Sequence, residues 1–449
     1  MSHDLTILDK GLARFLENDL ILVFHAGISL DEFQNAASGL LSNLPVLGAK
    51  LNFLRTKIEP SRNEHSLSEF WQGTELDLHV DDVLKTPWIN GAVKSVELSH
   101  VKNFLDSKLN IIKLLHQCVV TIQTVVFIDG IILRFKVQGP FGDANAVLQI
   151  ARAYCSILDG YLPTMVSSFR PPLKLKDALV EKASEQSRYV NDSPIAQLHA
   201  ESFRIGWLPF LRRAFRALRH KLEDKARHTL RRINMTLHIP QAAINTWNNE
   251  AGKRGIQVTE HDLVLAFLYQ QASTDPTDPS TFSIVMNIQR HLETEAAFGN
   301  PWFLIPVQSR QFNGLRSQND TTALVDRAVH IRQTINSARA PLCPYQIMEQ
   351  HSPMKNRPFV CRKFASKSTQ LVVASWAKQP IIDLRVQGSN PVLADVSVNF
   401  CGVLKRLGFL VNDLVLLWKG DRHEDGYWVQ GYLSSNLWER LTNSLAEFV

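Results

Sequence analysis

The stretch Val119–Leu158 constrains the fold of this chain more than any other. Two runs of β-branched and apolar residues, Val119–Ile128 and Ile131–Val137, lie on either side of Asp129-Gly130. An Asp-Gly pair between two such runs is typical of a β-hairpin, because a tight primed turn needs positive φ angles. The sequence therefore predicts two paired strands joined by a turn at Asp129-Gly130.

A short turn and a helix are predicted to follow this hairpin. The second run ends at Gly139-Pro140, where proline removes a hydrogen-bond donor and fixes φ. From about Asp143 or Asn145 onward, apolar residues recur with helical spacing: Val147, Ile150, Ala151, Tyr154, Ile157 and Leu158. A side chain on such a turn lies at the mouth of a sheet, where functional groups are often placed.

These residues resemble a motif of the BAHD acyltransferases and of the wider superfamily of CoA-dependent acyltransferases and condensation domains. Members carry a hairpin of the form QxxxFxxGxxL, and this chain has Gln123, Phe127, Gly130 and Leu133 at the matching positions. The turn that follows carries HxxxDG in the family. The resemblance therefore implies that the turn after Val137 corresponds to the catalytic turn.

The family's catalytic turn is only partly kept. Asp143 occupies the aspartate position, but Gly139 stands where the family has its catalytic histidine, and Ala144 replaces the following glycine. In the family, that histidine takes a proton from the acceptor as it attacks the acyl thioester. The aspartate pairs with an arginine, which the resemblance assigns to Arg290. The chain thus resembles a fungal-type secondary-metabolite member with a degenerate HxxxD motif.

Further landmarks occur in the family's order along the chain. Ser29 or Asp31 is predicted to cap an early helix that ends at Pro45, and Thr259 with Asp262 a later one. The segments that resemble family motifs are Leu44–Leu51, Thr259–Tyr269, Ser283–Gln289, Phe298–Pro301 and Leu371–Asp383, whereas the DFGWG motif is largely lost.

The resemblance implies an α/β fold with two lobes like those of chloramphenicol acetyltransferase. In such lobes, mixed sheets carry flanking helices and a channel runs between the lobes. A chain of 449 residues is also long enough for two domains. We predict an N-terminal lobe over residues 1–170, a crossover over 171–232 and a C-terminal lobe over 233–449.

The amino-acid composition limits the kinds of ligand and partner that we expect for this chain. The formal charge is +6 and the five cysteines form no CxxC pair, which argues against a metal site and for a reducing compartment. No nucleic-acid-binding module, signal peptide or bilayer-spanning run is found. The basic stretch 204–232 is either a solvated amphipathic helix or a cationic face for phosphate. We expect a cytoplasmic monomer without nucleic acid or a membrane span.

No replacement for the histidine stands out in the sequence. Gln138 adjoins Gly139 but is no base at neutral pH, and Asp143 is interpreted as structural more than catalytic. The histidines His100, His116, His261, His291 and His351 have no motif context, and Cys155 is expected in the core. The predicted catalytic turn is Gln138, Gly139 and Asp143, and the predicted substrate-binding residues are Arg385, Gln387, Asn399 and Trp302.

Three functions remain open on this basis. The leading hypothesis is a natural-product enzyme that folds and cyclises a hydrophobic terpenoid or polyketide, as in an intramolecular Diels–Alder reaction. Holding two reacting ends together lowers such a barrier without a cofactor, and a hydrogen-bond donor assists. The first alternative is an O-acyltransferase that uses acyl-CoA as co-substrate with a non-standard base. The second is a non-catalytic pseudoenzyme.

Overall fold

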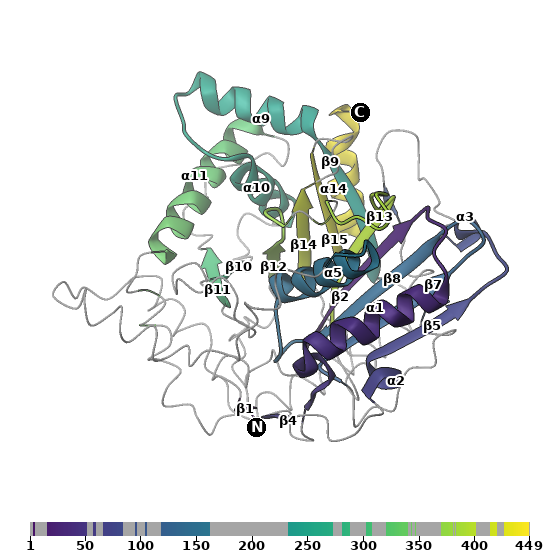
Figure 1. Cartoon of the computed structure of the whole chain (residues 1–449). Helices are drawn as coiled ribbons and strands as arrows, with labels where there is room; N and C mark the ends of the chain where they lie inside the picture. The colour runs from purple at the N-terminus through teal and green to yellow at the C-terminus, as the bar shows by residue number, and fades with distance from the viewer. Residues whose placement is uncertain are drawn as a thin grey trace, which may run out of the picture.

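Two mixed sheets with flanking helices form the framework of the molecule (Figure 1). The computed structural model describes residues 3–4, 16–51, 57–59, 66–83, 95–96, 104–105, 118–161, 232–272, 281–287, 302–307, 320–339, 343, 346, 370–379, 381, 383–400, 414–419 and 426–448. The predicted α/β class with two mixed sheets is confirmed. Within the described residues, no helix combines the length and the apolar character that a bilayer span requires.

The first sheet has five strands and carries helices on one face. Its order is β13 (Leu393–Phe400), β2 (Leu16–Phe24), β8 (Ile131–Gln138), β7 (Val120–Val126) and β5 (Trp71–Glu75). Helices α1 (Leu30–Asn43) and α5 (Ala144–Leu158) cover one face, and Leu20, Leu22, Leu133 and Phe135 pack beneath them. Alternate residues on each strand therefore point away from these helices.

The second sheet has seven strands. Its order is β11 (Trp302–Val307), β10 (Thr281–Asn287), β12 (Gln370–Ser375), β14 (Leu414–Lys419), β15 (Gly426–Ser434), β9 (Arg232–Pro240) and β6 (Ser95–Val96). Its helices are α9 (Gln241–Lys253), α10 (Glu260–Ala272), α11 (Thr321–Ala338) and α14 (Ser435–Leu445). The small elements are β1 (His3–Asp4), η2 (Pro45–Gly48), β3 (Lys50–Leu51), β4 (Lys57–Glu59), α2 (Ser66–Phe70), α3 (Val80–Val83) and η7 (Ala446–Phe448).

Each large sheet takes one strand from the other half of the sequence. β13 belongs to the C-terminal half but pairs with β2 along its full length, and β6 belongs to the N-terminal half but pairs with β9. The lobe boundaries stay a prediction, since a division at one point of the chain leaves both strands in the other lobe. The predicted crossover up to residue 231, its basic stretch and the turn Phe298–Pro301 lie outside the described residues.

The predicted hairpin is confirmed, but the predicted turn is wrong. Val126 pairs with Ile131, so Phe127 and Gly130 close the loop and the turn is centred one residue earlier, on Ile128-Asp129. Gly130 does not have a positive φ. A Cβ on Gly130 would lie 2.7 Å from the carbonyl oxygen of Phe24 on β2. Glycine is needed there because of a close backbone approach, which the hairpin's own sequence does not reveal.

The predicted helix caps are confirmed by side-chain contacts. Ser29 caps α1 in a capping box with Glu32, and Thr259 and Asp262 bond reciprocally at the start of α10. After Pro45 the chain forms the 3₁₀ turn η2, and the strand β3 begins only at Lys50. The region from Ser66 contains the short helices α2 and α3 on either side of β5.

Replacing Gly130 by alanine tests the close approach at the hairpin. We expect Gly130→Ala to lower the free energy of unfolding by about 1–3 kcal/mol, because the added Cβ meets backbone that must shift. Urea denaturation measures this. Gly252→Ala is the matched control, since Gly252 lies in α9 with nothing within 4 Å of its Cβ position. The control should be neutral or stabilising, and equal stability of both variants would contradict the interpretation.

Candidate functional site

Polar side chains alternate with apolar ones on β8 and β13 of the first sheet, and the strand between them, β2, carries Glu17 and Asp19. These polar side chains, where the structure describes them, point away from α1 and α5, because apolar residues of the same strands, such as Leu20, Phe135 and Val396, pack toward those helices. We call the set the polar grid: Glu17 and Asp19 on β2, Arg134, Lys136 and Gln138 on β8, and Asp395, Ser397 and Asn399 on β13. Every grid side chain that the structure describes is at least nine-tenths buried.

The strand register sorts the grid into rows. Glu17 pairs with Gln138 on one side and with Asn399 on the other, so these three residues form the row nearest the turn at Gly139. The next row contains Ser397, Asp19 and Lys136, and the third contains Asp395, Ile21 and Arg134. Residues from three distant parts of the sequence therefore meet on one enclosed surface.

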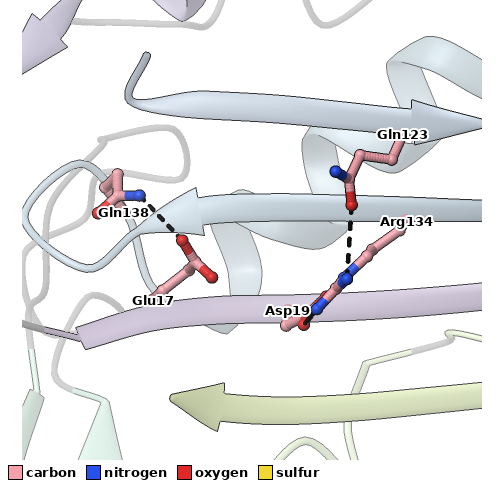
Figure 2. Close-up of polar contacts among 5 residues, drawn as sticks. All are labelled: Glu17, Asp19, Gln123, Arg134 and Gln138. Carbon is pink, nitrogen blue, oxygen red and sulfur yellow. Dashed lines mark hydrogen bonds and ion pairs between the residues drawn. The ribbon is translucent and has the colours of Figure 1, made fainter. Parts of the chain in front are cut away.

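An ion pair anchors the middle of the grid (Figure 2). Arg134 binds Asp19 through two nitrogens, with Nε 2.9 Å from Oδ1 and Nη2 2.7 Å from Oδ2. Nη1 of Arg134 also donates to Oε1 of Gln123, the glutamine of the hairpin motif, at 3.5 Å. Both ionic side chains are at most 1% exposed. Bidentate geometry fixes the guanidinium in one orientation, so this part of the grid is rigid.

A second carboxylate lies directly beside the turn that lacks the histidine. Nε2 of Gln138 donates to Oε2 of Glu17 at 3.0 Å (Figure 2), and the backbone N–H of Gly139 donates to the carbonyl of Leu16 at 2.7 Å. Glu17 is 5% exposed. The Glu17 carboxylate thus binds the residue that directly precedes Gly139, where the family has its histidine. It lies on the same face of the sheet as Gln138.

Asp143 holds the turn to both lobes. Its Oδ1 accepts hydrogen bonds from the backbone N–H groups of Asn145 and Ala146, so it caps α5. Its Oδ2 accepts from Nδ2 of Asn287, at the end of β10 in the second sheet, at 2.7 Å. Arg290, the partner that the resemblance assigns, lies outside the described residues, so that pair stays a prediction. These contacts give Asp143 a positioning role in the described structure.

The structure brings some of the predicted substrate-binding residues together and separates others. Asn399 shares a row with Gln138, and Trp302 is the backbone partner of Asn287 on the neighbouring strand. Gln387, with a φ of 50°, donates its N–H to Asp159 Oδ1 at the far end of α5. A helix of 15 residues spans about 22 Å, so the exposed Gln387 lies far from the turn.

Arg385 lies in the same exposed loop as Gln387. Cys155 is buried in the core as expected, and burial raises the pKa of its thiol to about 12. Of the histidines singled out from the sequence, the structure describes His261, on α10. Burial lowers the pKa of His261 to about 4. Neither residue offers a nucleophile or base near the turn.

Glu17, Asp19, Arg134 and Lys136 were not predicted as site residues from the sequence. A signal was present in LRFKVQ, which places polar residues at every second position of an otherwise apolar strand, whereas LENDL has three polar residues in a row. Such alternation usually marks a solvent-exposed face, and only the register shows that the rows are aligned and buried.

Solved structures share this architecture over nearly the whole chain. F. sporotrichioides TRI101 complexed with coenzyme A and T-2 matches with a TM-score of 0.65 and 14% identity, over 98% of this chain and 97% of that one. Vinorine synthase matches with a TM-score of 0.63 and 12% identity, over 99% and 93%. The chain has the fold of the BAHD acyltransferases.

The BAHD fold also extends to condensation domains. The condensation domain of the monacolin K polyketide synthase MokA matches with a TM-score of 0.55 and 10% identity, over 100% of this chain and 96% of that one. No protein-family model and no curated protein sequence matches the chain. The resemblance drawn from the motifs is thus confirmed in the fold, and the activity has to be argued from the site.

Replacing one partner of the Arg134–Asp19 ion pair tests whether the pair is buried. We expect Asp19→Asn to lower the free energy of unfolding by about 3–5 kcal/mol, because it leaves the Arg134 charge enclosed without its counter-ion. The double replacement Asp19→Leu with Arg134→Met removes both charges, and we expect it to recover most of that loss. Guanidinium denaturation compares the three proteins, and a double variant as unstable as Asp19→Asn would refute this account.

Lowering the pH tests the enclosed histidine. The unfolded chain protonates His261 near pH 6.5, whereas the folded chain does so only near pH 4. Folding is therefore disfavoured as the pH falls through this window, by at most about 3 kcal/mol. We expect His261→Phe to lose less stability than the wild type between pH 7 and pH 4 in urea titrations. Parallel acid profiles of the two proteins would show that His261 does not contribute.

Proposed function

We propose that the protein is an acyl-CoA-dependent acyltransferase in which the carboxylate of Glu17 does the work of the missing histidine. The observation that carries the proposal is the position of Glu17, a buried carboxylate beside Gly139 that is held by Gln138. The fold supports acyl transfer, because the similar structures include BAHD acyltransferases. TRI101, crystallised with coenzyme A, supports acyl-CoA as the co-substrate.

The proposed reaction needs one base and a fixed turn. Glu17 takes a proton from the acceptor, the acceptor attacks the thioester carbonyl carbon, the C–S bond breaks, and the leaving thiolate takes up the proton that Glu17 received. Gln138 orients the carboxylate through its hydrogen bond, and the contact of Asp143 with Asn287 fixes the turn against the second lobe. The enclosed position of Glu17 keeps bulk water from competing with the acceptor.

A second candidate is the cyclisation of a hydrophobic terpenoid or polyketide. Gly139 favours it, because a chain that has lost the histidine of its fold has lost the usual acyl-transfer base. The enclosed donors of the grid offer groups that polarise a reacting carbonyl. The similar structures give more support to acyl transfer, which we therefore place first.

Acyl transfer is tested with the purified protein, acetyl-CoA and a panel of alcohols and amines, by measuring thiol release and product mass together. We expect Glu17→Gln to lower kcat by about 100-fold or more, the range of a lost general base. Gly139→His placed in the Glu17→Gln protein should restore part of the rate. Asp82→Asn, which makes the same change on the exposed helix α3, is the matched control and should retain full activity.

Two outcomes would overturn the proposal. Conversion of a polyene to an isomer of equal mass without acetyl-CoA would establish cyclisation in place of acyl transfer. Wild-type activity in Glu17→Gln would show that the base lies elsewhere.

A further inference from the structure

We infer that the acceptor of this enzyme carries an amine, which the Glu17 carboxylate binds as an ammonium ion. The inference rests on the proposed function, because it names the substrate class of the same site. It begins from an imbalance of charge within the grid. Glu17 is a buried carboxylate whose side-chain partner is the uncharged amide of Gln138.

Two of the other three buried carboxylates in the described part of the chain are bound by arginines. Asp19, two residues further along the same strand and face, is bound by Arg134, and Asp262 is bound by Nε of Arg332 at 2.7 Å. None of the ion pairs among the described residues includes Glu17. Its Oε1 accepts no hydrogen bond there, yet it is not among the fully enclosed polar atoms. A small group can therefore reach it.

The physical cost of this arrangement identifies the missing partner. Removing a carboxylate from water is unfavourable unless a cation and good hydrogen bonds compensate it. An ammonium group brings a positive charge and up to three donors, whereas an alcohol brings one donor and no charge. Charge-assisted hydrogen bonds are roughly twice as strong as neutral ones. The site is therefore complementary to an amine, and less so to the isosteric alcohol.

The same contact performs the chemistry. The bound ammonium gives one proton to Glu17, and the nitrogen lone pair then attacks the thioester carbonyl carbon. The C–N bond forms and the C–S bond breaks, and the thiolate leaves with a second proton from the nitrogen. The amide product keeps the third proton, and Glu17 releases its own proton to water. Glu17 thus returns to its starting charge, and the positive charge of the ammonium ion leaves as the proton released to water, so no further reactant is needed.

Binding of an amine and of its alcohol isostere tests the inference directly. We expect the wild-type protein to bind 2-phenylethylamine at least tenfold more tightly than 2-phenylethanol in calorimetric titrations. Glu17→Gln should abolish that preference while leaving the alcohol unaffected. Equal or tighter binding of the alcohol, or no measurable binding of the amine, would overturn the inference.

The stability of the ligand-free protein gives an independent readout. Glu17→Gln removes a buried charge that has no counter-ion, so we expect it to raise Tm by about 2 °C. The matched control Asp19→Asn, on the same strand and face, should lower Tm because Arg134 keeps its charge. A fall in Tm for both variants would mean that Glu17 is structural, and would overturn the inference.

The two experiments separate this inference from the proposed function. Tight amine binding without acyl transfer from acetyl-CoA would leave the inference standing and remove the function. Acetylation of alcohols in preference to amines, still dependent on Glu17, would leave the function standing and remove the inference.

Discussion

The antiparallel register of β13, β2 and β8 is the constraint on which the site depends. Side chains alternate between the two faces of a sheet, so a slip of one residue moves every side chain to the other face. Such a slip on β2 would place Glu17 and Asp19 under α1 and α5 and would expel Leu20 and Leu22. The apolar side chains packed beneath the helices therefore also fix where the charges lie.

The two buried carboxylates on β2 differ in how their charges are compensated. The Arg134–Asp19 pair satisfies its own charges, although apolar residues of similar size often do as well or better. Glu17 forms no ion pair with the described residues, and its carboxylate accepts a hydrogen bond from the neutral amide of Gln138. A protein that keeps an enclosed acid beside a neutral amide gives up stability, which is typical of groups retained for binding or catalysis.

Local patterns predicted the hairpin and the capped helices, because each depends on neighbouring residues. The grid depends on register between segments more than a hundred residues apart, which no local pattern contains. Gln138 and Asn399 were therefore named separately, while Glu17, which lies between them, was missed. The need for glycine at position 130 was misread for a similar reason, since it comes from the close approach of the Phe24 carbonyl on another strand.

The exchange of β13 into the first sheet has a consequence for synthesis of the chain. β2 is made near the N-terminus, but its partner β13 is complete only at Phe400. Until then, one edge of β2 lacks the strand that covers it in the folded protein, and exposed strand edges promote association between chains. One edge of β2 thus stays uncovered while the residues between Phe24 and Leu393 are synthesised, and the grid cannot close before β13 is made.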